Sequence, residues 1–510
     1  MIAPWKALTA HLGELETLEG AAAVLGWDQS TYQPPKASAA RGEQLALLGR
    51  LAHERVVDPR VGEWLEALAA SPDEPGRVHL ASGLPFDEVR RATVRNLRRR
   101  RDRAVRVPAA LVSALARAQS DGFAIWAHAK AANDFGSFAP ILGTLVALTR
   151  ERAAAIDANK PVYDVLLDEF DPGVSAASLG PMFERLGAGL VGMVGELAAR
   201  PAVPKLDATV PIPVQRAIHH RVLGALGYDL DGGRLDDAEH PFSVGIHPTD
   251  VRITTHLYEN DLLWGLGGTI HECGHALYEQ GLPVGLRGTG LCAAASTGLH
   301  ESQSRLWENF VGRSRPFCGW FAGVLAEHLG DDAPSEDTLW RANHRVDRGL
   351  VRVAADEVTY NLHVAVRFRL ETALMSGDLA IRDLPGAWDD AYEAMLGLRP
   401  PDAARGVLQD VHWAAGMFGY FPGYTLGNLY AAALWGALRR DLPQVDDAIR
   451  VGEFGGIRAW LREKVHAVGA VKDASDIVRD AAGETDLVAG LLQDLAERYG
   501  RANGIVLRGG

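Results

Sequence analysis

Three residues in the middle of the chain have the types and spacing of a hydrolytic metal centre. His271 and His275 are separated by three residues, and Glu272 directly follows the first, in the pattern H-E-x-x-H. On a helix, residues four apart lie on one face, so both imidazoles can reach one tetrahedral metal ion. A glutamate in this position can take a proton from water that the metal activates. The motif therefore predicts zinc ligands at His271 and His275 and a peptidase's catalytic base at Glu272; the alternative is two histidines on a helix surface.

The helix that must carry this motif has recognisable ends. Asn260-Asp261 is a candidate N-cap, and Gly281 followed by Pro283 predicts the stop. Cys273 lies two residues from His271 and therefore faces the opposite side of such a helix. We expect it to be a small buried thiol and not a metal ligand.

A candidate third ligand is Glu301, which lies 26 residues after His275. Its apolar neighbours Leu299, Leu306 and Phe310 have helical spacing. Two histidines and a glutamate from a second helix form a ligand set that leaves one position of a catalytic zinc open for water. Spacing alone does not separate Glu301 from the other acids of the chain.

Most of the remaining sequence predicts helices. In the range 175–200, for example, apolar residues recur at intervals of three and four. The exception precedes the metal motif, where residues 242–246 and 251–255 alternate by two around the turn-like His247-Pro248-Thr249-Asp250. This pattern predicts an antiparallel hairpin. An edge strand beside a peptidase cleft can hydrogen-bond an extended peptide.

Composition narrows the class of protein. With 47% hydrophobic residues and a formal net charge of -13, the 510-residue chain is typical of a soluble globular protein that has no nucleic-acid partner. Nine arginines between Arg90 and Arg106 have no aromatic residues among them, so we interpret them as a solvated helix face and not as a phosphate-binding stripe.

Three cysteines in so long a chain cannot form a disulfide framework, which favours the cytoplasm. The first residues lack a basic segment followed by an apolar one, and no run of 18 apolar residues occurs. We therefore expect no signal peptide and no contact with a membrane.

Six short elements, in order along the chain, resemble the carboxypeptidase Taq family of thermostable zinc metallocarboxypeptidases. They are His240-Pro241-Phe242, Asp250-Val251-Arg252-Ile253-Thr254, the motif from His271 to His275, His300-Glu301-Ser302-Gln303, Val351-Arg352-Val353-Ala354-Ala355-Asp356, and Gly406-Val407-Leu408-Gln409-Asp410-Val411-His412-Trp413. The resemblance extends over nearly the whole chain.

The resemblance implies a nearly all-α fold. Residues 1–510 would form a single domain with two lobes around one deep active-site groove, and a small antiparallel sheet would lie at the groove wall. The family also implies a homodimer that removes single C-terminal residues from peptides with broad specificity, C-terminal proline being disfavoured. One zinc ion per chain would be held by His271, His275 and Glu301, with cobalt as a possible substitute.

The same resemblance suggests roles for residues outside the metal motif. Arg352 is the leading candidate to hold the substrate's terminal carboxylate, and Arg252 is the competing one. Arg352 lies in a run that predicts a buried helix, where Asp356, four residues on, is a possible partner. His412 and Tyr424 would donate hydrogen bonds to the tetrahedral intermediate, although a lone histidine such as His412 is commonly a neutral core residue.

Two other functions compete with an exopeptidase. An endo-acting zinc oligopeptidase would use the same metal chemistry without an arginine for the terminal carboxylate. A non-catalytic helical interaction protein could retain a relic metal site, but the intact Glu272 argues against it.

Overall fold

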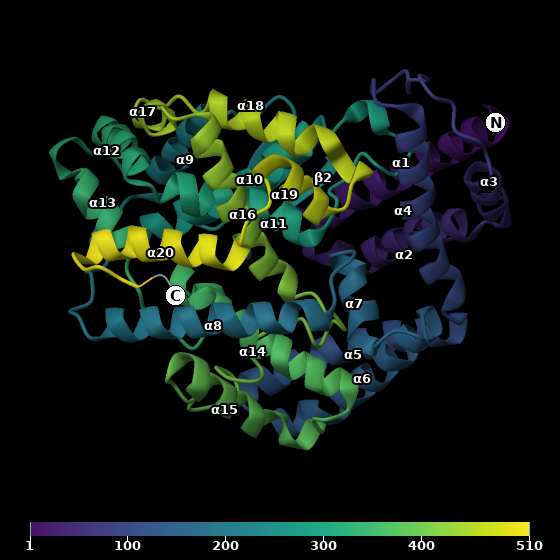
Figure 1. Ribbon diagram of the computed structural model, residues 1–510. Coiled ribbons are helices and arrows are strands. Elements are labelled where there is room, and N and C mark those ends of the chain that lie inside the picture. The colour runs from purple at the N-terminus through teal and green to yellow at the C-terminus, as the bar shows by residue number, and fades with distance from the viewer. Residues whose placement is uncertain (1, 509–510) are drawn as a thin grey trace. The chain divides into compact units, whose positions relative to one another are not determined.

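Helices make up most of the chain in the computed structural model, which describes residues 2–508 (Figure 1). They belong to two compact units, each built from three stretches of sequence. The first unit comprises Met1–Val105, Leu206–Asn343 and Ala433–Thr485, and the second comprises Arg106–Lys205, His344–Ala432 and Asp486–Gly510. The nearly all-helical class predicted from the sequence is confirmed.

The first unit contains the small sheet and the helices around it. Its elements are α1 (Ile2–Thr31), η1 (Pro35–Ala37), α2 (Ser38–Val57), α3 (Pro59–Ala69), α4 (Phe86–Arg106), α9 (Ile212–Leu226), β1 (Gly233–Asp237), β2 (Ser243–His247), β3 (Asp250–Thr255), α10 (Leu262–Gly281), η2 (Val284–Leu286), α11 (Thr297–Arg305), η3 (Leu306–Gly312), α12 (Arg315–Leu329), η4 (Gly330–Asp332), α13 (Glu336–Asn343), α17 (Val445–Arg450), α18 (Gly455–Lys464), η7 (His466–Val471) and α19 (Ala474–Ala482). Of the η segments, η3 is a π-helix and the others are 3-10 helices.

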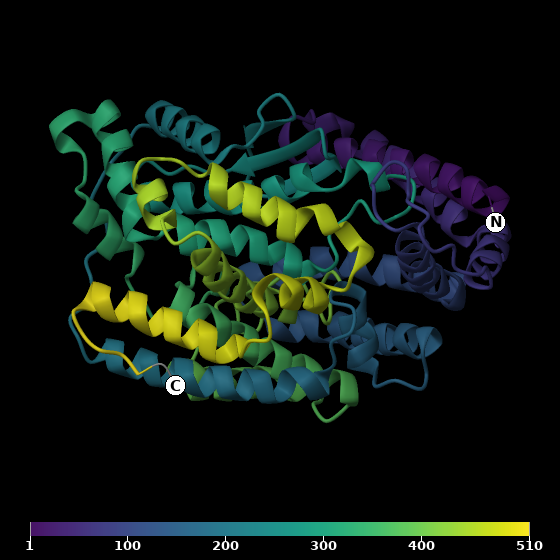
Figure 2. The ribbon, with the colours of Figure 1, turned by 45° about the horizontal axis from the view of Figure 1, so that its top comes forward.

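The second unit is helical in the residues that the structure describes. Its elements are α5 (Ala109–Ala132), α6 (Phe135–Ile156), α7 (Val162–Phe170), α8 (Ala176–Ala198), the 3-10 helix η5 (Arg352–Ala354), α14 (Glu357–Ser376), the 3-10 helix η6 (Ile381–Asp383), α15 (Leu384–Leu396) and α20 (Leu487–Asn503). A further helix, α16 (Pro422–Asp441), begins in this unit's sequence. The predicted amphipathic helix appears as α8, where Ser175 forms a capping box with Ser178, and α20 packs along it (Figures 1 and 2).

The sheet confirms the predicted hairpin and adds a strand to it. β2 and β3 pair antiparallel, and β1 pairs with the other side of β3 in parallel, so the order is β1-β3-β2. The alternation in residues 242–255 indicated the hairpin, whereas β1, with two aspartates among its five residues, carries no such pattern. β2 and β3 pack on α10, and α1 packs on β2 (Figure 2). The hairpin thus adjoins the helix that carries the metal motif.

The arginine run forms much of α4 and is paired with protein groups. The guanidinium of Arg90 is only 3% exposed and donates to the carbonyl of Leu68 and to Asp73. Arg98 and Arg100 form ion pairs with Glu66 of α3 and Glu19 of α1. The prediction of a solvated helix face is therefore wrong for Arg90, because its side chain is buried and binds neighbouring segments.

Two further features bear on sequence predictions. Cys273, Cys292 and Cys318 form no disulfide with one another. Among the residues that the structure describes, no helix is both long and apolar enough to cross a membrane.

Candidate metal centre and active site

The three predicted metal ligands converge from two neighbouring helices of the first unit. His271 and His275 lie one turn apart on α10, and Glu301 lies on α11. The Oε2 atom of Glu301 is 3.5 Å from Nε2 of His271 and 3.3 Å from Nε2 of His275. The candidate ligand atoms all lie within 4.8 Å of one another. These donors, two imidazole nitrogens and a carboxylate oxygen, fit a catalytic zinc ion with one position left for water.

The sequence of α10 explains how Glu301 comes so close. Asp261 caps the helix by accepting from the backbone N–H of Trp264, and the helix ends at Gly281, as predicted. A Cβ atom on Gly274 would lie 2.6 Å from the carbonyl oxygen of Gln303 and from Cα of Ser304. Only glycine allows α11 this approach, so Gly274 of the motif is needed for the third ligand to reach the histidines.

A second carboxylate, Glu308, orients the first histidine. Glu301, Arg305 and Glu308 are spaced by four and three residues, and Glu308 lies in the π-helix η3, a rare helical form that is frequent at functional sites. Oε2 of Glu308 is 2.9 Å from Nδ1 of His271. A carboxylate at this distance fixes the tautomer in which Nδ1 carries the proton, and Nε2 is then free to bind a metal.

Two arginines keep these carboxylates ionised. The Nε of Arg305 donates to Glu301 at 2.7 Å, and its Nη1 donates to Glu308 at 3.2 Å. Arg313 donates to the other oxygen of Glu308 at 2.8 Å. Burial acts to raise the pKa of Glu301, but Arg305 and the two imidazoles outweigh it and hold that pKa well below its usual range. Glu301 is therefore ionised, as a metal ligand would need to be.

The second histidine packs against another imidazole ring. His275 stacks on His300, with ring centroids 4.4 Å apart, and Nε2 of His300 is 2.9 Å from Glu279. Burial lowers the pKa of His275 to about 3, so its imidazole is neutral, as metal binding requires.

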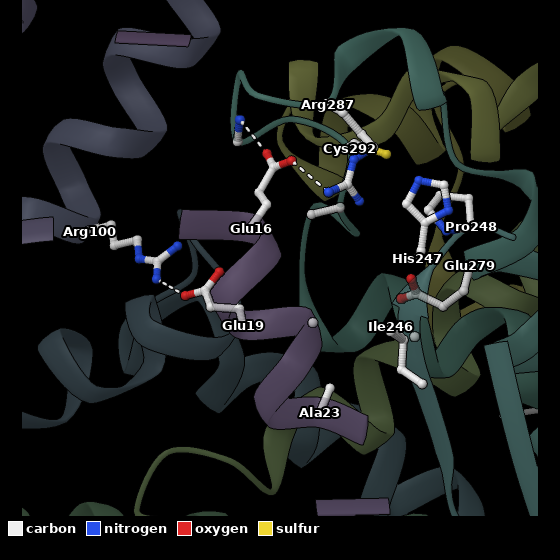
Figure 3. A pocket seen from close by; sticks show the side chains of 14 residues that line it. Glu16, Glu19, Ala23, Arg100, Ile246, His247, Pro248, Glu279, Arg287 and Cys292 are labelled. Carbon is white, nitrogen blue, oxygen red and sulfur yellow. Dashed lines mark hydrogen bonds and ion pairs between the residues drawn. The ribbon is translucent and has the colours of Figure 1, made fainter. Parts of the chain in front are cut away.

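Glu279 also lines a neighbouring pocket of about 380 Å³ (Figure 3). The pocket lies between α1 and β2, and Figure 3 shows Glu16, Glu19, Arg287 and His247 around it. Glu16 faces Arg287 at 3.5 Å, and Glu19 pairs with Arg100. The pocket therefore adjoins the metal site through Glu279 and His300, but its other carboxylates are already paired.

Glu272, the predicted base, is buried next to His271 on α10. The residue is only 8% exposed, and Ser243, the first residue of β2, favours its charged form. Burial raises the pKa of Glu272 to about 7, against the opposing effect of His271. A carboxylate with a raised pKa accepts a proton more readily, which suits general-base catalysis near neutral pH.

Arg252 lies on the sheet of the same unit, and its charge is already matched. Its Nε and Nη2 donate to the two oxygens of Asp250 at 2.8 and 2.9 Å. Its guanidinium lies over the Trp27 ring, 4.3 Å from the centroid. One aspartate and one aromatic face thus hold this arginine.

Arg352 belongs to the second unit and is bound differently from the prediction. The run that predicted a buried helix contains the 3-10 turn η5 and then the N-cap of α14, because Asp356 caps that helix by accepting from Val358 and Thr359. Asp356 is therefore not the partner of Arg352. The Nε and Nη2 of Arg352 donate instead to Oδ1 of Asp410, at 3.1 and 2.9 Å.

A second buried arginine shares that aspartate. Arg367, with 0% exposure, donates from Nε and Nη2 to Oδ2 of Asp410, at 2.7 and 2.5 Å. Burial acts to raise the pKa of Asp410, but Arg367 and Arg352 outweigh it and hold that pKa below its usual range. Two guanidinium groups thus face one carboxylate. We call Arg352, Arg367 and Asp410 the guanidinium cluster.

The structure brings His412 and Tyr424 to this cluster. Nε2 of His412 is 3.4 Å from the Tyr424 hydroxyl, and the Arg352 guanidinium lies 5.0 Å from the Tyr424 ring centroid. Burial lowers the pKa of His412 to about 4, so the imidazole is neutral near pH 7. A neutral imidazole and a phenol can each donate one hydrogen bond to a developing oxyanion.

Several of these site residues escaped sequence reasoning. Glu308 and Arg305 had a usable signal, since their spacing from Glu301 places all three on one helix face. Arg367 and Glu279 had none, because each reaches its partner only through the tertiary fold. Asp410 was noticed only as a neighbour of His412.

Comparisons with known proteins agree over nearly the whole chain. The family model described as Carboxypeptidase Taq (M32) metallopeptidase matches residues 7–499. The chain is 41% identical to thermostable carboxypeptidase 1 of Thermus thermophilus over 506 residues, which is 96% of each protein. It is 35% identical to carboxypeptidase 1 of Bacillus subtilis, with 94% of each chain covered.

Solved structures show the same fold. The crystal structure of the M32 carboxypeptidase from Deinococcus radiodurans R1 has a TM-score of 0.92 and 36% identity, and covers 98% of this chain and 100% of that one. A Pyrococcus furiosus carboxypeptidase structure has a TM-score of 0.92 and 31% identity, covering 98% and 99%. The chain therefore belongs to the carboxypeptidase Taq family and is a metallocarboxypeptidase, a peptide hydrolase that requires a divalent metal.

Proposed function

We propose that the protein is a zinc enzyme that releases single residues from peptides with a free C-terminus, and that Arg352 holds the terminal carboxylate. The observation that carries this proposal is the donor count of Arg352. A guanidinium has five N–H donors. Arg352 gives two to Asp410 and one to the Tyr360 hydroxyl, although the residue is only 4% exposed. Two N–H groups remain for a planar, charged acceptor such as a carboxylate.

The competing arginine is less suited to this task. Arg252 is neutralised by its own aspartate in a two-pronged contact. Arg352 shares one aspartate with Arg367 and so has positive charge in excess. A substrate carboxylate gains more from an uncompensated guanidinium than from one that is already paired.

His271, His275 and Glu301 would hold the zinc ion. When bound, the metal supplies Lewis-acid activation of water and of the scissile carbonyl group. Glu272 accepts the proton of the attacking water on its carboxylate and then delivers it to the leaving amine. His412 and Tyr424 donate hydrogen bonds to the tetrahedral oxyanion, each worth on the order of 10²–10³ in rate.

Finer properties of the family belong to the same proposal. We expect one zinc ion per chain, replaceable by cobalt, which metal analysis of the purified protein measures. We also expect a homodimer, broad specificity with C-terminal proline disfavoured, and residence in the cytoplasm. The absence of a disulfide among the three cysteines supports a reducing compartment. Thiol titration of the denatured, unreduced protein should therefore find three thiols.

Product analysis tests the release of single residues. A peptide of eight or so residues with a free C-terminus is incubated with the enzyme, and the products are followed by mass spectrometry. The proposal expects a ladder of peptides shortened one residue at a time from the C-terminus, and no product from Glu272→Gln. Internal fragments as the first products would indicate an endo-acting oligopeptidase instead.

A further inference from the structure

Arg367 is a fully buried arginine of α14, and the proposed reaction assigns it no task. It donates to Asp410 from Nε and Nη2, and its Nη1 donates to the carbonyl of His363 at 2.7 Å and to the Tyr392 hydroxyl at 3.2 Å. These contacts use four of its five N–H groups. Arg367 therefore has little left to offer a substrate, in contrast to Arg352.

The effect of Arg367 on its neighbours is electrostatic. Asp410 places Oδ1 against Arg352 and Oδ2 against Arg367, so neither oxygen is left over. Without Arg367, Arg352 and Asp410 would form an ordinary one-to-one pair, as Arg252 and Asp250 do. With Arg367, the guanidinium cluster carries two positive charges and one negative charge in a buried place.

The other titratable groups around the cluster do not cancel this excess directly. Burial lowers the pKa of both His363 and His412, so both are neutral near pH 7. Glu371, one turn after Arg367 on α14, accepts hydrogen bonds from Trp413, Tyr163 and the backbone N–H of Gly419. Burial raises the pKa of Glu371 to about 7, so it is a weaker counter-charge than an ordinary glutamate.

We propose that Arg367 is a specificity-determining positioning residue: by occupying half of Asp410, it leaves Arg352 with the unmatched charge that selects a peptide's terminal carboxylate. This inference rests on the proposed role of Arg352. Selectivity for a free C-terminus then depends on two arginines sharing one aspartate in the guanidinium cluster. A group that never touches the substrate then controls the discrimination between free and blocked C-termini.

The measured quantity is kcat/KM for a free peptide divided by kcat/KM for the same peptide with an amidated C-terminus. Arg367→Met keeps bulk in the core but removes the charge, and should lower this ratio about tenfold or more. Arg367→Lys keeps the charge and should retain most of the ratio. Measurements of metal content and thermal unfolding check that each variant is folded and has bound its metal.

The decisive variant is the pair Arg367→Met with Asp410→Asn. It restores one uncompensated positive charge on Arg352 without restoring the bonds of Arg367 to His363 and Tyr392. Charge balance predicts that the ratio recovers toward the wild-type value. A purely structural role of Arg367 predicts that the double variant is no better than Arg367→Met, and that result would overturn the inference.

Arg352→Ala separates failure of this inference from failure of the proposed function. If Arg352→Ala keeps the wild-type ratio, the assignment of Arg352 itself is wrong. If Arg352→Ala loses the ratio but a folded Arg367→Met keeps it, the function stands and the role of Arg367 is rejected. If Arg352→Ala and Arg367→Met both lose the ratio, and Arg367→Met with Asp410→Asn recovers it, the result supports both the proposed function and the role of Arg367.

Discussion

Glu301 in the first unit and Asp410 in the second are both buried carboxylates beside arginines, yet they leave opposite groups available. Glu301 gives Oε1 to one arginine, Arg305, and directs Oε2 toward His271 and His275. Asp410 gives both oxygens to two arginines. The first arrangement retains an electron-pair donor and suits a metal cation, whereas the second retains guanidinium N–H groups and suits an anion.

The comparison teaches that the two clusters leave different groups available to a ligand: a carboxylate oxygen of Glu301 in the first, and guanidinium N–H groups of Arg352 in the second. A buried charge needs a partner, so whatever the protein leaves unmatched must be matched by a ligand. We propose that these groups hold the two things a metallocarboxypeptidase must bind, a divalent metal and a terminal carboxylate.

The largest expected effect comes from removing the base beside the metal ligands. Glu272→Gln should keep the metal, because Glu272 is not a ligand, but the amide cannot accept the proton of the attacking water. We expect kcat to fall by roughly 10³-fold or more. Steady-state kinetics together with metal analysis check this, and near-normal hydrolysis by a metal-loaded variant would rule out the role.

A smaller effect is expected from Glu308→Gln. This change weakens the bond that orients His271, so affinity for zinc should fall by about 10- to 100-fold. Competition with a chromophoric chelator measures this affinity independently of turnover. The matched control is Glu66→Gln, which alters an exposed glutamate of α3 that pairs with Arg98. Equal losses in the two variants would show that Glu308 has no special relation to the metal.

The smallest expected effect concerns how stability depends on pH. His363 lies next to the guanidinium cluster, where a protonated imidazole would add a third buried cation. Burial, followed by Arg367, depresses the pKa of His363. A pKa below the unfolded value of about 6.5 means that the neutral form adds stability above that pH, and that this stability is lost as the pH falls. The free energy of unfolding should therefore decrease below about pH 6.5.

In His363→Gln this decrease should be shallower, by up to about 1.4 kcal/mol per pH unit. Urea unfolding midpoints at pH 7 and pH 5 measure it, and His328→Gln, at an exposed position, serves as the control. An unchanged slope in His363→Gln would mean that this histidine does not limit acid stability.

Helices, the hairpin and the metal motif were predictable because each depends on local spacing. Asp261, Gly281 and the pair of histidines in α10 act within a few residues of one another, and alternation by two marked β2 and β3. Strand β1 was missed because a parallel strand at a sheet edge with two aspartates has no apolar alternation.

The partners of the site residues were not predictable to the same extent. Asp356 was a reasonable partner for Arg352 if both lay on one helix, but its side chain caps α14 and breaks that helix before it reaches Arg352. The actual partner, Asp410, lies 58 residues away in sequence. Such pairings depend on tertiary packing, for which one sequence carries no signal.

The most direct test of the central claim is a double cycle on Arg352 and the substrate's terminal carboxylate. The measurement is kcat/KM for wild type and Arg352→Ala on the free and amidated forms of one peptide, with Arg252→Ala as the control variant. Removing one partner of the contact should cost roughly 2–5 kcal/mol, or about 30- to 4,000-fold. Because both changes break the same contact, the losses should not add: amidation should cost little more once Arg352 is gone. Additive losses at Arg352 with clear coupling at Arg252 would contradict the account, and so would equal cleavage of both peptides by the wild type.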